Sequence, residues 1–191
     1  MTRGTGKLEG YLARERIKIV KTLIKDHPNP TQILDIGCGN DTLLLNALEI
    51  KEKHGIDPNL LFTKDNLIKT EIRRTLPYPN DYFDIIVMSA VLEHLEEPDQ
   101  LLYDTKFKLK PSGLLIITTP SPSSKPLLEA MAALNIVSPE EIREHKKYYS
   151  QKTLLETLTK AGYDPNRIKI GSFEFSLNNY ATARKEDVSN V

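Results

Sequence analysis

The 191-residue chain has a single cysteine, no net charge and no long apolar run. Cys38 cannot form an internal disulfide, which indicates a reducing compartment. Because 26 basic residues balance 26 acidic ones, no overall field draws the protein to nucleic acid or anionic lipid. No segment approaches the roughly 20 apolar residues of a membrane span, and the polar N-terminus lacks a secretory signal pattern. We therefore expect a cytoplasmic protein with no membrane span and no nucleic-acid partner.

The order of apolar patterns predicts an α/β fold. Short apolar runs predict parallel strands over residues 32–36, 53–57, 67–72, 83–90 and 114–119. Helical periodicity separates them and predicts helices over 7–25, from 41 onward, over 60–66 and from 98 to the Pro111-Ser112-Gly113 turn. This alternation is typical of a doubly wound, Rossmann-like sheet with helices on both faces. Two further strands, 167–173 and 175–183, are joined tightly and so predict an antiparallel C-terminal hairpin in a mostly parallel seven-stranded sheet.

The length favours one domain, residues 1–191. We expect an N-terminal helix within 1–30, a core over 31–120, a proline- and serine-rich segment with helices over 121–150, and a C-terminal helix and hairpin over 151–191. Within 121–150, Ser138 to Glu141 has the form of a capping box with proline at the first helical position.

Two helices have a predicted apolar face. In the first helix this face holds Leu8, Tyr11, Leu12, Ile19, Val20 and Leu23, and the simplest interpretation of Tyr11 and Arg16 is packing and solvation. The helix that follows Ser150 is expected to bury Leu154, Leu155 and Leu158, and to stop at Gly162.

A glycine turn follows the first strand. In Ile33 to Asn40, an apolar run leads through Asp35 to Gly37 and Gly39, and a helical pattern follows. Glycine allows a sharp bend and a close approach of a ligand to the backbone. Asp57 stands 22 residues after Asp35 (57 − 35), at the spacing where such folds place a carboxylate near ribose hydroxyls.

The residue at position 42 separates two kinds of nucleotide ligand. A dinucleotide fold would place a third glycine there, to bring the helix against the strand over a pyrophosphate, but this chain has Thr42. The sequence therefore favours a nucleoside ligand without a pyrophosphate, and it disfavours an NAD-dependent oxidoreductase.

Five ordered segments between residues 33 and 120 resemble the class I S-adenosylmethionine-dependent methyltransferases, in particular their small-molecule type 11 or 12 subgroup. Leu34 to Gly39 resembles motif I, and Gly55 to Asn59 resembles the ribose-binding acidic motif. Leu76 to Ile86, Val91 to Leu95 and Leu109 to Leu115 are similar to three later motifs of the family. Each segment is weak alone, but the ordered set is specific.

The resemblance implies a set of cofactor-binding residues. Gly37 and Gly39 would lie against the methionine moiety, with Asp35 supporting the turn, and Asp57 would accept hydrogen bonds from both ribose hydroxyls. The adenine would contact Glu71 and Ile72, and the region near the sulfonium would be lined by Ser89, Ala90 and His94. The turn residue Cys38, interpreted as structural, and Pro58 complete the set. Two departures from the family pattern are Asp41, where a small residue is usual, and Glu71, where aspartate is more frequent.

The same resemblance implies methyl transfer from S-adenosylmethionine to an O or N acceptor, a small molecule or biosynthetic intermediate, with residues 121–150 as a substrate cap and 31–120 as the cofactor-binding core. A hydroxyl or amine acceptor must lose a proton, and His94 and His145 are the candidate bases. The alternatives are a packing residue beside the cofactor for His94 and a solvated helix end for His145. We expect no metal site, and a monomer or homodimer. A cofactor-binding but catalytically idle sensor or partner domain remains the alternative function.

Overall fold

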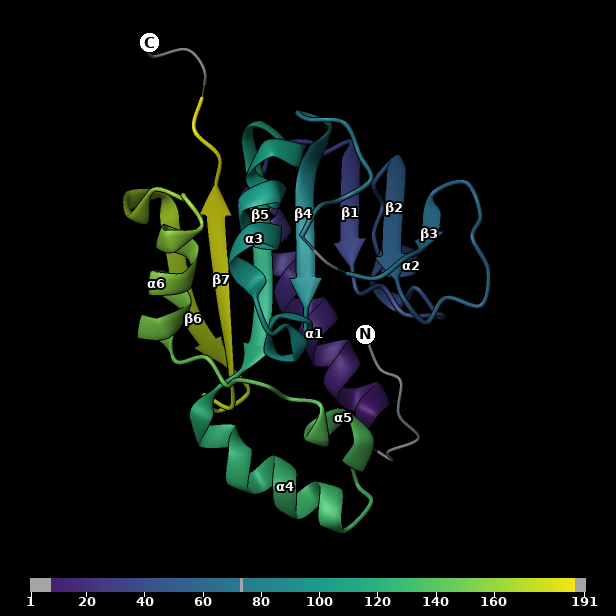
Figure 1. Ribbon diagram of the computed structural model, residues 1–191, viewed down its shortest axis with the longest axis vertical. Coiled ribbons are helices and arrows are strands. Elements are labelled where there is room, and N and C mark those ends of the chain that lie inside the picture. Colours follow the sequence, from purple (N-terminus) through teal and green to yellow (C-terminus); the bar gives the residue numbers. More distant parts are fainter. Residues whose placement is uncertain (1–7, 73, 188–191) are drawn as a thin grey trace.

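A seven-stranded sheet organises the protein, whose computed structural model describes residues 8–72 and 74–187 (Figure 1). The strand order is β3-β2-β1-β4-β5-β7-β6; six strands run in the same direction, and β7 runs antiparallel to them between β5 and β6. This arrangement confirms the predicted mostly parallel sheet with a C-terminal hairpin. The strands are β1 (Gln32–Ile36), β2 (Glu52–Asp57), β3 (Leu67–Lys69), β4 (Phe83–Ser89), β5 (Leu109–Pro120), β6 (Ile168–Phe173) and β7 (Asn178–Arg184).

Helices cover both faces of the sheet and one of its ends. In Figure 1, α3 (Pro98–Lys108) and α6 (Gln151–Lys160) lie in front of the sheet, and α1 (Glu9–Ile24) lies behind it. The short helix α2 (Leu43–Ala47) contacts α1 and β2. The helices α4 (Lys125–Ala133) and α5 (Pro139–Arg143) lie beyond the carboxyl ends of the parallel strands. Three single turns complete the described elements: η1 (Leu92–His94), η2 (Pro122–Ser124) and η3 (Pro165–Arg167).

Two apolar cores sandwich the sheet. Leu34, Ile86 and Leu115 point toward α3 and α6, while Ile33 and the neighbouring side chains of β4 and β5 pack against α1 and α2. Because the central strands are buried on both faces, their sequences read as continuous apolar runs and not as alternating ones. This burial explains why these strands were the most readily predicted elements.

One predicted helix and several predicted boundaries are wrong, including the start of the last strand, which is Asn178 and not residue 175. Residues 60–66 form no helix, because Leu61 and Phe62 are 80% and 57% exposed and so bury no apolar face. The third strand ends at Lys69 and not at residue 72. The helix from Pro98 ends at Lys108, before the proline, and β5 begins at once with a shift in register against β4 that accommodates residues 110–113.

The apolar faces predicted for the first helix and for the helix after Ser150 are buried in their central turns, but three of the predicted positions are exposed. Leu8, which precedes α1, and Tyr11 in its first turn are 39% and 52% exposed, because this end of the helix extends beyond the sheet. In α6, Leu154 and Leu158 are buried, but the third buried side chain of that helix is Thr157 and not Leu155. The capping box is confirmed, since the Ser138 hydroxyl accepts a hydrogen bond from the Glu141 amide.

The strand order reverses between β1 and β4, and open α/β sheets bind ligands at the carboxyl ends of the strands beside such a reversal. Residues 121–149, with α4 and α5, lie over this end of the sheet, and we call them the cap. The Leu8 amide donates a hydrogen bond to the Ile136 carbonyl oxygen (3.2 Å), which links the start of α1 to the cap.

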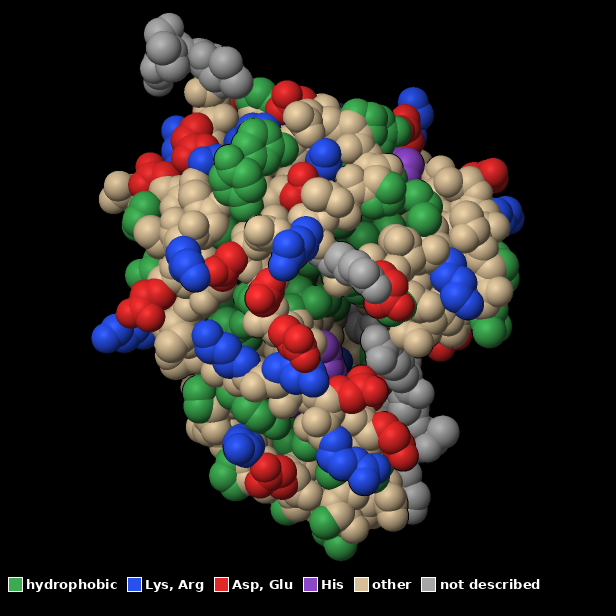
Figure 2. Space-filling view, in the orientation of Figure 1, with side chains coloured by type: hydrophobic (Ala, Val, Ile, Leu, Met, Phe, Trp, Pro, Cys, Tyr) green, Lys and Arg blue, Asp and Glu red, His purple; other side chains and the backbone are tan. Residues whose placement is uncertain are grey.

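Acidic and basic side chains are interspersed over the face seen in Figure 2, as the balanced composition predicts. Among the described residues, no helix is long and apolar enough to cross a membrane.

Candidate active site

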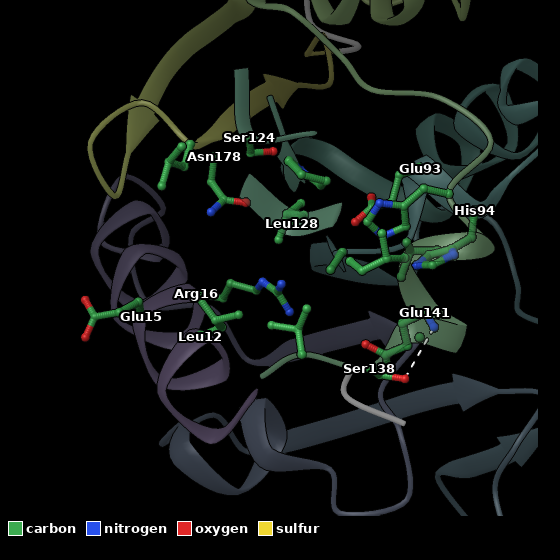
Figure 3. Close-up of a pocket in the computed structure, with 18 of the residues that line it drawn as sticks. Leu12, Glu15, Arg16, Glu93, His94, Ser124, Leu128, Ser138, Glu141 and Asn178 are labelled. Carbon is green, nitrogen blue, oxygen red and sulfur yellow. Dashed lines mark hydrogen bonds between the residues drawn. The ribbon is translucent and has the colours of Figure 1, made fainter. Parts of the chain in front are cut away.

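A cavity of about 1050 Å³ lies between the carboxyl ends of the strands, the start of α1 and the cap (Figure 3). Its wall includes seven residues predicted for cofactor binding and the second candidate base. These eight residues are Gly37, Asp57, Pro58, Glu71, Ile72, Ala90, His94 and His145. The fold therefore brings together residues that are up to 108 positions apart (145 − 37).

The glycine turn after β1 has the conformation that its sequence predicts. Gly37 has φ +79°, in the left-handed region, and an added Cβ would lie 2.4 Å from Cγ2 of Val91. Its amide donates to the Ile56 carbonyl oxygen at 2.8 Å, so the turn is anchored to the neighbouring strand β2. Only glycine combines this backbone angle with so close an approach. The result is a tight turn of backbone in the cavity wall, which we call the cradle.

Asp57 ends β2 and faces this turn. Its Oδ2 accepts from the Gly39 amide (3.0 Å), and its Oδ1 accepts from the Asn59 amide (2.7 Å) and side-chain Nδ2 (3.1 Å). A carboxylate offers about four acceptor sites, of which these three bonds leave one. Asp57 can therefore take one further donor as it stands, and a second one if the exposed Asn59 side chain turns away.

Asp35 is the most unusual polar group of the turn. It is fully buried, and no described residue donates a hydrogen bond to either carboxylate oxygen. Burial raises the pKa of this carboxyl to about 7, and the Asp57 charge contributes in the same direction. A buried carboxyl without donors is costly unless something compensates it. Asp35 does not line the cavity, so its carboxyl lies inside the fold beneath the glycine turn.

Four residues of the predicted cofactor set do not line the cavity: Asp35, Cys38, Gly39 and Ser89. Cys38 packs its sulfur against Gly55, where an added Cβ would be 2.7 Å from Sγ, and burial raises the pKa of its thiol to about 12. The Ser89 hydroxyl is buried and shares a hydrogen bond with Thr118 (2.9 Å). Gly39 contributes the backbone amide bonded to Asp57. These residues support the turn and the floor of the site.

Glu93, His94 and His145 form a cluster on the cap side of the cavity. One carboxylate oxygen of Glu93 and one ring nitrogen of each histidine lie within 4.8 Å of one another. The Lys146 and Lys147 amides donate to the Glu93 carbonyl oxygen (2.8 and 3.3 Å), and these bonds hold the end of the cap against η1. The two candidate bases are thus brought together, with ring centroids 4.9 Å apart.

Arg16 reaches from α1 into the same cavity (Figure 3). No ion pair or hydrogen bond ties the guanidinium to another of the described residues. Its charge helps burial to lower the pKa of His145 and opposes the rise that burial causes in the pKa of Glu93, so it lies close to the cluster. Arg16 is therefore a half-buried cavity residue, and its interpretation as a packed and solvated side chain stays a prediction.

Sequence reasoning assigned no role to Glu93 or Arg16. The sequence did contain a signal for Glu93. This acidic residue stands among apolar residues in Val91 to Leu95, and its side chain is buried with them. Nothing local marks Arg16, which is one of several basic residues in α1. Only the position of that helix beside the cap gives it significance.

Comparison with known proteins agrees with this geometry. The model of a family described as a methyltransferase domain matches residues 8–167. A ubiquinone biosynthesis O-methyltransferase of Rickettsia typhi is 24% identical over 91% of this chain and 78% of its own length. A tRNA U34 carboxymethyltransferase of Nautilia profundicola is 33% identical, over 51% of this chain and 37% of its own length.

Solved structures of similar fold include two methyltransferases. An S-adenosylmethionine-dependent enzyme of Thermotoga maritima, described as a possible histamine N-methyltransferase, has a TM-score of 0.66 at 17% identity, over 90% of this chain and 87% of that one. Another, from Archaeoglobus fulgidus, has a TM-score of 0.62 at 21% identity, over 93% of this chain and all of that one. With the glycine cradle and Asp57 on one cavity wall, and a family match over most of its length, the chain belongs to the class I S-adenosylmethionine-dependent methyltransferases.

Proposed function

We propose that this enzyme methylates a hydroxyl group of a small-molecule acceptor held between the cofactor and the cap. The observation that carries the proposal is that one cavity contains both the cofactor cradle and the inner face of the cap. Its volume of about 1050 Å³ slightly exceeds the roughly 300–1,000 Å³ of ordinary ligand pockets. There is room for an acceptor beside the cofactor.

The residues present fit S-adenosylmethionine in a defined direction. Asp57 would hold the ribose, Glu71 and Ile72 would contact the adenine, and the backbone at Gly37 would lie along the methionine part. The cofactor supplies a methyl group on a sulfonium, with a neutral thioether as the leaving group. What this chain contributes is alignment of the acceptor and removal of its proton.

Arg16 would bind the carboxylate of the cofactor. The methionine part of the ligand ends in this anionic group, and Arg16 lies in the same cavity with unused donors. A guanidinium matches a carboxylate in geometry as well as charge. Asp41, which departs from the family pattern, is exposed and would repel an anion, so a cation from α1 is a reasonable compensation.

The cap would bind the apolar part of the acceptor. Leu128 and Met131 of α4 and Ile142 of α5 line the cavity opposite the strand ends. Oxygen is favoured as the methylated atom because the similar Rickettsia protein is named an O-methyltransferase. His94 and His145 stay candidates for handling the proton, at the place where the cap meets η1.

The test combines ligand binding with turnover. S-adenosylmethionine and S-adenosylhomocysteine should raise the melting temperature in proportion to their concentration, whereas NAD should not. Radioactive methyl transfer to a panel of catechols, phenols and amines then identifies the acceptor. Methylation of amines alone would contradict the O-acceptor proposal. Cofactor binding without transfer to any acceptor would favour a catalytically idle domain that serves as a sensor or partner.

A further inference from the structure

The carboxyl group of Glu93 is the most deeply buried acid beside the cap. The residue is 1% exposed, yet it lines the same cavity as Gly37 and Ala90. The Thr119 hydroxyl donates to its Oε2 at 3.1 Å, and η1 and the cap hold its backbone in place. The side chain is therefore fixed at the wall of the cavity, on the side of the cap.

The surroundings of Glu93 suit a group that takes up a proton at neutral pH. Burial raises the pKa of its carboxyl to about 7, although Arg16 from α1 and the Thr119 hydroxyl from β5 act in the opposite direction. A general base works best when its pKa lies near the working pH. An exposed glutamate, with a pKa near its ordinary 4.5, would be a far weaker base.

His145 differs from Glu93 in this respect. Burial, the neighbouring His94 and the Arg16 charge lower its pKa to about 4, so its imidazole is neutral at pH 7 and accepts protons poorly. Its Nδ1 lies 3.1 Å from the Tyr148 hydroxyl, which is only partly buried. A neutral imidazole can take a proton at one nitrogen while it releases one from the other. One ring nitrogen of His145 lies within 4.8 Å of a Glu93 carboxylate oxygen, so His145 stands between this buried acid and Tyr148.

We propose that Glu93 is the general base of methyl transfer, and that His145 and Tyr148 return its proton to solvent. This inference deepens the O-methylation proposed above and rests on it. A lone pair of the acceptor oxygen forms the new O–C bond, while the C–S bond breaks and its electron pair stays on sulfur. The hydroxyl proton passes to the Glu93 carboxylate. It then leaves through His145 and Tyr148, which restores the carboxylate for the next turnover.

The first experiment compares two acceptors of different acidity with the Glu93→Gln variant. The probes are 4-methylcatechol, whose hydroxyls stay protonated at neutral pH, and 4-nitrocatechol, whose more acidic hydroxyl ionises near it. Loss of a general base should slow methylation of 4-methylcatechol by about 100-fold or more. The pre-ionised 4-nitrocatechol should be slowed far less, and the dissociation constant of S-adenosylmethionine should not change.

The matched control is Glu156→Gln, which removes an exposed carboxyl on α6. It should leave both rates unchanged. Equal slowing of the two catechols by Glu93→Gln, or no slowing, would overturn the base role. Activity that is lost with EDTA and restored by Mg²⁺ would also overturn it, because a metal at this cluster would then activate the acceptor.

The second experiment tests the route of the proton. In His145→Gln, methyl transfer in a single turnover should keep its rate, whereas steady-state turnover should fall, because the Glu93 proton then leaves slowly. A fall of both rates together would contradict the relay through His145.

The third experiment does not depend on the acceptor. With S-adenosylhomocysteine bound, the ¹³C signals of labelled glutamate carboxyls are followed against pH, and the Glu93→Gln spectrum identifies the signal of Glu93. Titration of the Glu93 signal near pH 7 supports the inference, and titration near the ordinary glutamate pKa of 4.5 overturns it. If the enzyme binds the cofactor but methylates no catechol, the proposed acceptor class fails, while this measurement still decides whether Glu93 has the properties of a base.

Discussion

The Gly39 amide donates a hydrogen bond to Oδ2 of Asp57 at 3.0 Å, which joins the turn after β1 to the end of β2. The two sequence features that first suggested a nucleoside site are therefore parts of one structure. The bond orients the Asp57 carboxylate along the cavity wall, with one acceptor site unused. Because of this bond, a substitution of Asp57 should alter the conformation of the glycine turn as well as the binding of the ligand.

Asp57→Ala should weaken S-adenosylmethionine binding by about 1.5–3 kcal/mol, the range of hydrogen bonds to charged groups. Isothermal titration calorimetry measures this change directly. The matched control is Asn59→Ala, which removes one donor to Asp57 but keeps the carboxylate. This control should bind the cofactor as well as the wild type, or better. An unchanged dissociation constant for Asp57→Ala would mean that the ribose is held elsewhere.

Gly37→Ala should abolish the cradle. The new Cβ would lie 2.4 Å from the Val91 side chain, at a φ of +79° that costs an L-residue about 1–2 kcal/mol by itself. We expect a lower free energy of unfolding, measured in urea, and loss of the cofactor-dependent rise in melting temperature. Gly10→Ala is the control, because nothing lies within 4 Å of its added Cβ and the residue is helical. Wild-type binding by Gly37→Ala would exclude this turn from the cofactor site.

Arg16→Gln should weaken cofactor binding by about 1.5–3 kcal/mol if the guanidinium holds the carboxylate of the ligand. Arg14→Gln is the control, since Arg14 is exposed on the same helix and donates to the Gly10 carbonyl oxygen. A decarboxylated analogue of S-adenosylhomocysteine separates this role from a general effect of charge. It should bind wild type and Arg16→Gln equally, and a remaining difference would place Arg16 at another part of the ligand.

The sequence predicted those structural features that are determined by residues close together in the chain. Gly37, Asp57 and the buried strands follow from short-range rules for turns, acidic residues at strand ends and apolar runs, and the structure has each of them in place. The same rules failed at residues 60–66, where Leu60 is buried but Leu61 and Phe62 face outward. A helical spacing of apolar residues predicts a helix only when tertiary packing covers that face.

The part of the site that escaped prediction depends on distant contacts. Arg16 became a cavity residue because the start of α1 extends past the sheet and bonds to the cap at Ile136. Glu93 and His145 meet because two cap amides bond to the Glu93 carbonyl oxygen. Such long-range pairs have no periodic signature in one sequence. Of the three residues in the cluster of Glu93, His94 and His145, the sequence therefore singled out only the two histidines.

The burial of Asp35 makes stability depend on pH in a direction opposite to that of most carboxylates. Its pKa is raised from 3.8 to about 7 in the folded protein, so between these values the folded state holds a proton that the unfolded state has lost. The free energy of unfolding should therefore fall as the pH rises from about 4 to 7, by up to ~4 kcal/mol from this group alone.

Asp35→Asn removes this titration, and urea unfolding at pH 5 and pH 8 without ligand measures the effect. The free energy of unfolding of the variant minus that of the wild type should be larger at pH 8 than at pH 5. This holds whether the variant is more or less stable than the wild type at either pH. The comparison of differences matters because Glu93 is shifted in the same direction and titrates in both proteins. If the free energies of unfolding of variant and wild type differ by the same amount at pH 5 and pH 8, Asp35 keeps an ordinary pKa in the folded protein.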